Sequence, residues 1–280
     1  MIIALFPNIN KKSAGNLARG ICEFLVQRDI DVVVDDAEAA AIEAPPLSSV
    51  DAKAVDFSIS MGGDGTILRL IHQHPELEAP IFGINLGGLG FMADIPISEV
   101  YPSLQSLIDG NYRVQQRLMM EGCSVHNGRC FAVNEMAVHR AQNPSLIELA
   151  VHVDGLYLNT FGADGIIIAT PSGSTAYSLA AGGPILMPEL QAFVITPISP
   201  HTISNRPVVL MPEKDIQIQY LSEHDPVEIA FDGISRCTMN TGEVFHITVS
   251  KRVFSLVSLP HHDYFATLRT KLGWSGKLKA

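Results

Sequence analysis

The sequence of 280 residues is poor in cysteine and in basic side chains. Its four cysteines are scattered, with no C-x-x-C pair and no histidine at zinc-ligand spacing. This excludes a disulfide framework or structural zinc site and favours reduced thiols. Lysine and arginine total 19 against 29 acidic residues, which gives a formal net charge of −10. Such a surface repels nucleic acid and anionic membranes, so an anionic ligand must be held locally by backbone amides, helix N-termini or a divalent cation.

Targeting and membrane signals are also missing. Residues 1–12 have no basic region ahead of their apolar run, so they predict a first strand and not a signal peptide. Residues 165–188 carry no charge, yet they include four glycines and three prolines and do not predict a membrane helix. We therefore expect a cytoplasmic protein with neither a nucleic acid nor a membrane as partner.

The first part of the chain alternates short apolar runs with helical spacing. The apolar runs, each typical of a buried strand, are residues 2–6, 31–34, 55–60 and 80–84. Strands that alternate with helices in this way imply a parallel, doubly wound (Rossmann-like) α/β sheet. We assign this N-terminal α/β domain to residues 1–116.

From about residue 117 the pattern changes to many short strands. Asn127-Gly128 is a strong signal for a hairpin, and the last two strands are predicted over residues 245–249 and 253–259. This predicts a mostly-β C-terminal domain over residues 117–258. Within the final segment, residues 259–280, apolar side chains at helical spacing predict a C-terminal helix that packs back on the first domain.

The stretch M-G-G-D-G-T lies between a predicted strand and a predicted helix. The strand would deliver Gly62 and Gly63 to the edge of the sheet where open α/β folds bind ligands, and glycine lets backbone N–H groups approach a phosphate. Asp64 would repel such an anion, which makes sense if it meets a hydroxyl proton or a metal ion there. The alternative is a tight turn with Asp64 as N-cap. Neither the Walker lysine pattern nor G-x-G-x-x-G is present.

Two further stretches could form a ligand site. Asn134 and Glu135 put an amide beside a carboxylate at a strand edge, where they can bind an adenine amino group and ribose hydroxyls, although an ordinary polar pair is the simpler interpretation. Residues 161–184 run through Asp164, a small-residue loop and the start of a short helix. A planar ligand could lie on that loop, and a purely structural strand-to-helix connection is the alternative.

Taken together, these stretches resemble the NAD kinase family. The motifs that carry the resemblance occur in the family's order and cover most of the chain: G-G-D-G-T (62–66), N-L-G-G-L-G-F (85–91), N-E (134–135), D-G-I-I-I-A-T-P-S-G-S-T-A-Y-S-L-A-A-G-G-P (164–184) and P-H-T-I-S-N-R-P (200–207). The long fourth motif is highly specific. G-G-D-G-T alone is not, because diacylglycerol and sphingosine kinases and phosphofructokinases carry related loops.

The resemblance implies ATP-dependent phosphorylation of the 2′-hydroxyl on the adenosine ribose of NAD, with Mg²⁺ or another divalent metal escorting ATP. Asp64 would be the catalytic proton acceptor, and Asp232-Gly233 would lie nearby. The residues implied to bind NAD are Asp64, Gly65, Asn134, Glu135, Gly162, Asp164, Thr175, Ala176, Tyr177, Ser178, Leu179 and Ala180. Family members are commonly homodimers or homotetramers. No residue is assigned as a metal ligand.

The phosphate-binding candidates are Gly62, Gly63, Thr66 and Arg69, the last of which could equally be a solvated helix arginine. The chain also departs from the family at Gly162, where a basic residue is frequent, and at Ile234, where a polar one is frequent. Both departures concern how the phosphates or the nicotinamide end would be held.

Two other functions use parts of the same pattern. A lipid kinase of the diacylglycerol type would carry G-G-D-G-T but needs a basic or apolar membrane-facing surface, against which the acidic composition argues. A non-catalytic dinucleotide sensor would keep the binding loops but has no reason to keep an aspartate beside the phosphates.

Overall fold

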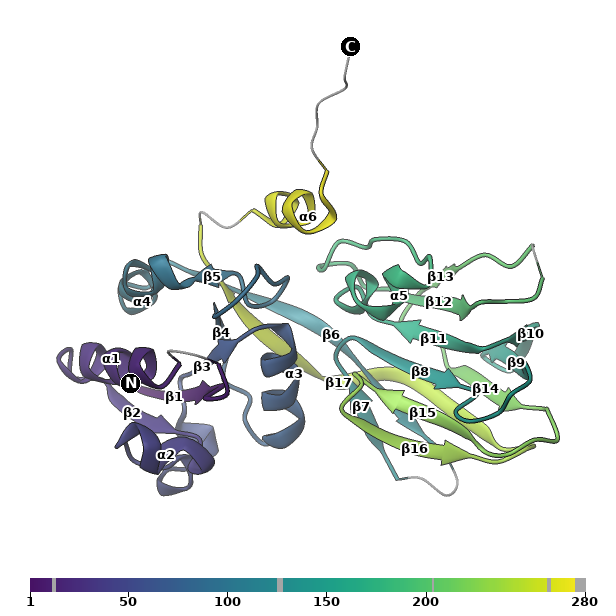
Figure 1. The fold of residues 1–280 in the computed structure, drawn as a ribbon, viewed down its shortest axis with the longest axis horizontal. Helices are drawn as coiled ribbons and strands as arrows, with labels where there is room; N and C mark the ends of the chain where they lie inside the picture. The colour runs from purple at the N-terminus through teal and green to yellow at the C-terminus, as the bar shows by residue number, and fades with distance from the viewer. Residues whose placement is uncertain (12–13, 125–127, 203, 261–262, 275–280) are drawn as a thin grey trace, which may run out of the picture. The chain divides into compact units, whose positions relative to one another are not determined.

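The computed structural model describes residues 1–11, 14–124, 128–202, 204–260 and 263–274. The chain forms two compact units, one of Met1–Gln115 with Ser255–Ala280 and the other of Gln116–Phe254 (Figure 1). The sequence predicts domain edges at 116/117 and 258/259. An N-terminal α/β part, a mostly-β part and a C-terminal helix are all present, as the sequence predicts.

The first unit is built on a parallel sheet with the strand order β2-β1-β3-β4. Its strands are β1 (Ile2–Pro7), β2 (Asp31–Val34), β3 (Phe57–Gly62), β4 (Ile81–Asn85) and the short β5 (Ile95–Pro96). Near its end, β17 (Val244–Ser258) joins this sheet by the pairing of Leu256 with Ile81. Every residue of β3 and β4 is buried, which explains why their sequences are continuous apolar runs.

The helices of the first unit are α1 (Ala14–Val26), α2 (Asp36–Ile42), α3 (Asp64–Gln73), α4 (Val100–Ile108) and α6 (Tyr264–Leu272), with the 3₁₀ turns η1 (Leu47–Ser49), η2 (Ala52–Ala54) and η3 (Ile97–Glu99). From β1 the chain moves to one side to form β2 and returns to the other side to form β3. This places a topological switch point at the carboxyl ends of β1 and β3, where open α/β sheets bind ligands.

Helix α6 comes from the end of the chain and contacts the first unit at Phe91. The Tyr264 and Phe91 ring centroids are 6.1 Å apart, and Lys271 Nζ lies 5.5 Å from the Phe91 ring centroid. Asp263 caps the helix by accepting a hydrogen bond from the backbone N–H of Phe265. The predicted return of the C-terminal helix to the first domain is therefore seen in these contacts.

The second unit is a sandwich of two antiparallel sheets. One has the order β13-β12-β11-β8-β15-β16, and the other runs β10-β9-β14-β17, with β6 pairing β17 and β7. Their bounds are β6 (Arg113–Cys123), β7 (Cys130–Ala132), β8 (Glu135–His139), β9 (Ile147–Val153), β10 (Leu156–Ala163), β11 (Gly165–Ala169), β12 (Phe193–Ile198), β13 (Val208–Leu210), β14 (Ile216–Tyr220), β15 (Val227–Phe231) and β16 (Ser235–Met239), with η4 (Gly173–Thr175) and α5 (Tyr177–Ala180) after β11.

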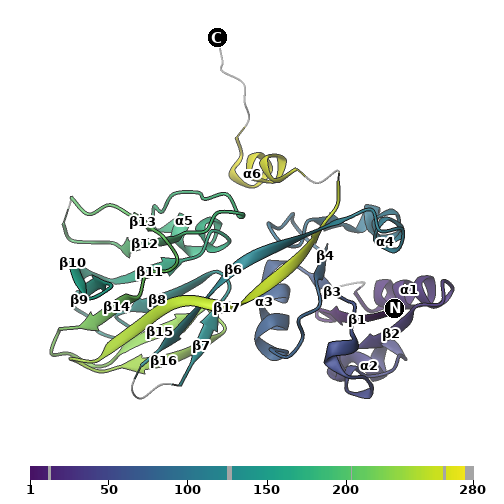
Figure 2. The same ribbon diagram turned by 180° about the vertical axis from the view of Figure 1, so that it is seen from behind.

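Residues from both sheets of this unit form one apolar core. Met136 and Ile168 from one sheet share it with Leu149, Ile218 and Phe245 from the other, and Figure 2 shows the two layers facing each other. The hairpin predicted at Asn127-Gly128 corresponds to the antiparallel pair β6–β7, although Asn127 itself lies outside the described residues. In the part of the chain that the structure describes, no helix has the length and apolar character needed to cross a membrane.

Candidate functional site

Asp64 is the first residue of α3. It follows Gly62, the last residue of β3, and Gly63. Its carboxylate points to the loop after β4, where Oδ2 accepts a hydrogen bond from the backbone N–H of Phe91 (2.8 Å) and Oδ1 accepts from Met92 (3.0 Å) and Ala93 (2.9 Å). The residue at the N-cap position is Gly63. The N-cap alternative for Asp64 is therefore wrong, and its carboxylate belongs to a contact between the two glycine-rich loops.

Lys11 is a cation that the motif analysis missed. Its Nζ donates to the carbonyl oxygen of Gly62 (3.1 Å), and a Cβ added at Gly87 would lie 3.2 Å from the same nitrogen. The ammonium group therefore lies between the M-G-G-D-G-T loop and the N-L-G-G-L-G-F loop. Its only sequence signal is a lysine a few residues after the first strand, which is too common to single out.

The first unit has a cavity of about 470 Å³ at the carboxyl ends of β1 and β2. Asn8 and Asp35 line it directly after these strand ends. Glu38 lines it from α2, and Thr66 and Arg69 line it from α3. Arg69 Nη2 lies 3.4 Å from Thr66 Oγ1. Two of the four phosphate-binding candidates thus share one polar cavity, and Gly62 and Gly63 lie in the loop before it.

Asn134 and Glu135 lie at the start of β8, a central strand of the second unit. Both are almost fully buried, with 6% and 8% of their surface exposed. The carboxylate of Asp232 accepts hydrogen bonds from the backbone N–H groups of Val133 (2.8 Å), Asn134 (2.7 Å) and Glu135 (3.1 Å). Asp232 has a positive φ of 51° in the β15–β16 turn, and its own N–H donates back to the carbonyl of Glu135 (3.0 Å). This double connection fixes the backbone of the N-E pair.

The T-P-S-G-S-T loop packs against the same backbone. Thr170 Oγ1 donates to the carbonyl of Val133 (2.6 Å), and a Cβ added at Gly173 would lie 2.5 Å from the carbonyl carbon of Asn134. Only glycine permits this approach. The N-E pair and the loop after β11 therefore lie against each other.

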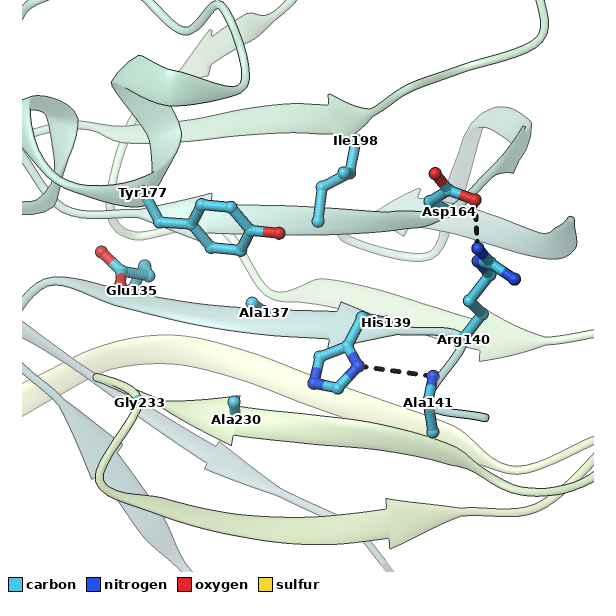
Figure 3. A pocket seen from close by; sticks show the side chains of 10 residues that line it. All are labelled: Glu135, Ala137, His139, Arg140, Ala141, Asp164, Tyr177, Ile198, Ala230 and Gly233. Carbon is cyan, nitrogen blue, oxygen red and sulfur yellow. Dashed lines mark hydrogen bonds and ion pairs between the residues drawn. The ribbon is translucent and has the colours of Figure 1, made fainter. Parts of the chain in front are cut away.

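A cavity of about 390 Å³ opens at this place in the second unit. Figure 3 shows Glu135 and Tyr177 at one end of it, and Asp164 and Arg140 at the other. Arg140 Nε lies 2.9 Å from Asp164 Oδ1, and the Arg140 N–H donates to the Asp164 carbonyl (3.0 Å). Arg140 was not among the predicted site residues, because a single arginine after a strand carries no motif.

The other predicted NAD-binding residues differ in what their side chains do. Ser178 is fully buried and its hydroxyl lies 2.9 Å from that of Thr196, so its side chain serves the packing of α5. Thr175 Oγ1 donates to the carbonyl of Ser172 (3.2 Å). Gly162 is in β10, where its carbonyl accepts from the N–H of His201 (2.9 Å). Gly65 follows Asp64 in α3 of the first unit, and Ala176, Leu179 and Ala180 belong to the short segment that carries Tyr177.

Two buried oxygen atoms in this region have no partner among the described residues: Asn134 Oδ1 and Glu135 Oε2. Buried polar atoms are normally hydrogen-bonded, so such a pair indicates a place where a ligand completes the bonding. Burial, and secondly the charge of Asp232, raise the pKa of Glu135 to about 8, against a smaller opposite effect of the Tyr177 backbone N–H.

Within the described ranges, no cluster of three or more histidine, cysteine, aspartate or glutamate residues could hold a metal ion. Mg²⁺ keeps several waters and is commonly bound by one or two carboxylates together with substrate phosphates. The residues present fit that second mode, since Asp35 and Glu38 line the cavity that also contains Thr66 and Arg69.

Comparison with known proteins identifies relatives over both units. Residues 3–112 match the model of the ATP-NAD kinase N-terminal domain, and residues 133–259 match that of the C-terminal domain. The NAD kinase of Protochlamydia amoebophila (strain UWE25) is 61% identical over 278 residues, which cover 99% of this chain and 100% of that protein. The NAD kinase of Geotalea daltonii is 36% identical, covering 97% of this chain and 98% of that protein.

Solved structures with the same fold include two kinases. Yeast NADH kinase complexed with NADH aligns with a TM-score of 0.85 at 24% identity, covering 100% of this chain and 89% of that one. An NAD kinase from Archaeoglobus fulgidus in complex with ATP aligns with a TM-score of 0.76 at 26% identity, covering 96% of this chain and 99% of that one.

Proposed function

Because the chain belongs to the ATP-NAD kinase family, we propose that it transfers the γ-phosphoryl group of ATP to the 2′-hydroxyl of the adenosine ribose of NAD, giving NADP. The reaction requires a dinucleotide site, a proton acceptor for the hydroxyl and a site for the phosphates of the donor. Each of these corresponds to one of the clusters described above.

The buried N-E pair, whose Glu135 lines the second-unit cavity, carries the assignment of the acceptor site. Asn134 Oδ1 and Glu135 Oε2 lack partners, and adenosine offers an amino group and ribose hydroxyls that can supply them. The Tyr177 ring lines the same cavity and is 45% exposed, so an adenine ring can stack on it. Asp164, held by Arg140, provides a polar group at the far end for the remainder of the dinucleotide.

Asp64 is assigned as the proton acceptor. A ribose hydroxyl is a poor nucleophile, and a positioned general base contributes roughly 10²–10⁴-fold to the rate. Three backbone N–H groups fix the orientation of the Asp64 carboxylate before substrate arrives. Alignment of this kind is the main protein contribution to phosphoryl transfer.

The donor phosphates are assigned to the end of β3 and the first turns of α3. Gly62 and Gly63 offer backbone amides, Thr66 and Arg69 line the adjoining cavity, and we add Lys11 because its ammonium group lies against both glycine loops. Mg²⁺ or another divalent ion, bound chiefly through those phosphates, would neutralise charge on the transferring group.

Incubation of the purified chain with NAD, ATP and Mg²⁺ tests the proposal, with NADP as the measured product. Asp64→Asn should keep the fold and NAD affinity but lose about 10²-fold or more of kcat. Asp31→Asn, an exposed change in β2, is the matched control and should keep wild-type turnover. Near-wild-type turnover of Asp64→Asn would remove Asp64 from the base role.

The same assay separates the other two functions. Tight NAD binding without NADP formation would indicate a dinucleotide sensor, and ATP-dependent labelling of diacylglycerol would indicate a lipid kinase. We also propose a cytoplasmic location, as the scattered cysteines indicate, and a homodimer or homotetramer, as the family resemblance implies. Light scattering of the native protein measures the second point.

A further inference from the structure

Glu135 lines the second-unit cavity, and the carboxyl group of the half-buried Asp232 accepts a hydrogen bond from the Glu135 backbone N–H. The surroundings of the two carboxyl groups differ. Asp232 accepts three backbone hydrogen bonds, which stabilise a negative charge on its half-buried carboxylate. Glu135 has one backbone donor near its carboxyl group, the N–H of Tyr177, and its Oε2 atom is buried without a partner among the described residues. A single negative charge on these two groups is therefore best placed on Asp232.

The interactions that shift the pKa of Glu135 involve no cation among the described residues. The neighbouring strand β11 has no ionisable side chain, and β15 contributes Glu228, which faces His139 at the other end of β8 (3.6 Å). The guanidinium of Arg140 is bound to Asp164, at the far end of the cavity (Figure 3). Among the described groups, Asp232 is the charged neighbour that acts on Glu135, and it opposes ionisation.

We propose that Glu135 meets NAD as a neutral carboxylic acid, and that Asp232 is the positioning residue that keeps it neutral. This inference rests on the proposed function. A neutral acid donates one hydrogen bond through its hydroxyl and accepts one through its carbonyl, whereas a carboxylate only accepts. The matching ligand feature is an acceptor next to a donor, as in the vicinal diol of a ribose or in a carboxamide. A raised pKa of about 8 for Glu135 agrees with this arrangement.

The two protonation states predict opposite dependences of NAD affinity on pH. If the neutral acid binds, the dissociation constant of NAD is constant near pH 7. At pH values above the pKa of Glu135 it increases. The increase approaches about tenfold per pH unit because one proton is linked to binding. If the carboxylate binds, affinity improves over the same interval. A window of pH 7–9.5 covers this titration.

The experiment measures the dissociation constant of NAD for the full chain by calorimetry across this window, without ATP. Wild type should weaken toward high pH. Glu135→Gln, which keeps one donor and one acceptor, should bind within about threefold of wild type at pH 7 and show a flat profile. Asp232→Asn should begin to weaken at lower pH than wild type, because Glu135 then ionises earlier.

Glu148→Gln, an exposed change on β9 away from the cavity, is the matched control and should retain the wild-type profile. If Asp232→Asn does not fold, NMR of ¹³C-labelled wild type gives the titration of Glu135 directly. The carboxyl resonance of Glu135 is assigned by its loss in Glu135→Gln. A midpoint above pH 7 supports the proposal, and an ordinary midpoint near 4–5 overturns it.

An affinity of wild type for NAD that improves with rising pH would also overturn the proposal. A loss of NAD binding in Glu135→Gln at pH 7 would overturn it as well. If wild type makes NADP while showing either result, only this inference fails. If wild type neither binds NAD nor makes NADP, the proposed function fails together with it.

Discussion

A side chain on Gly90 would overlap the carboxylate of Asp64. An added Cβ would meet Asp64 Oδ1 and would also lie 2.8 Å from the carbonyl oxygen of Ala93. The glycine therefore allows the loop after β4 to close around Asp64 and to present three backbone N–H groups to it. The position of the proposed base is set by a residue 26 positions later in the chain.

Gly90→Ala should displace the Asp64 carboxylate without removing it. We expect kcat to fall by about 10–100-fold, because misplacement of a reacting group by about 1 Å has effects of this size. The KM for NAD should change little. Gly88→Ala in the same loop is the control, since an added Cβ there meets nothing within 4 Å. Equal kcat values for the two variants would contradict the role given to Gly90.

Arg140→Gln should release Asp164 in the second-unit cavity. We expect the KM for NAD to rise roughly tenfold, equivalent to about 1.4 kcal/mol of binding, with kcat nearly unchanged. Both side chains are about one-third exposed, at 36% and 37%, so the change in unfolding free energy should stay below about 1 kcal/mol. Arg236→Gln removes a more exposed ion pair with Glu228 and serves as control. A parallel loss of kcat in Arg140→Gln would exclude a pure binding role.

Glu135→Gln should stabilise the fold at alkaline pH. The folded-state pKa of Glu135 is raised from 4.5 to about 8, so its contribution to stability is fully present below pH 4.5 and is lost as the pH rises to about 8. The glutamine in the variant cannot ionise, so the variant does not lose this contribution to stability. Urea unfolding should therefore show similar stability at pH 5 and an advantage on the order of a few kcal/mol for the variant at pH 8.5. An advantage that shrinks with rising pH would contradict a buried neutral acid.

Gly173→Ala should disturb the N-E pair through its backbone. The added methyl group would overlap the carbonyl of Asn134, and relief of such overpacking costs about 1–3 kcal/mol. We expect a lower unfolding midpoint together with weaker NAD binding. Gly128→Ala, where an added Cβ meets nothing within 4 Å, should leave both unchanged. Unaltered NAD affinity in Gly173→Ala would show that the loop does not determine the position of Asn134.

The first unit was the more predictable part of the fold. A strand buried on both faces needs a continuous apolar run, and β3 and β4 show this locally in their own sequences. The long strand β17 was not predictable in the same way, since two strands were expected over residues 245–249 and 253–259. The intervening Lys251 and Arg252 remain in the strand because their positions are not buried.

Site residues could be predicted where short motifs mark them, and were missed where long-range contacts create them. Asp64 and Glu135 lie in recognisable motifs, but the orientation of Asp64 depends on N–H groups of the separate loop after β4. Lys11 and Arg140 are single basic residues, and only the folded chain shows which carbonyl or carboxylate each one meets. Propensity and periodicity report local structure and contain no information about such partners.

The unit that contains Asp64 is discontinuous, since Met1–Gln115 is completed by Ser255–Ala280 after the whole of the second unit has intervened. A ribosome therefore releases the β-sandwich before it releases the strand end that pairs with Ile81 and the helix whose Tyr264 contacts Phe91. The loop that holds the proposed base acquires these neighbours only after the whole second unit has been synthesised. A nascent chain stopped after residue 254 would have both glycine-rich motifs and a complete sandwich, and yet an unfinished catalytic unit.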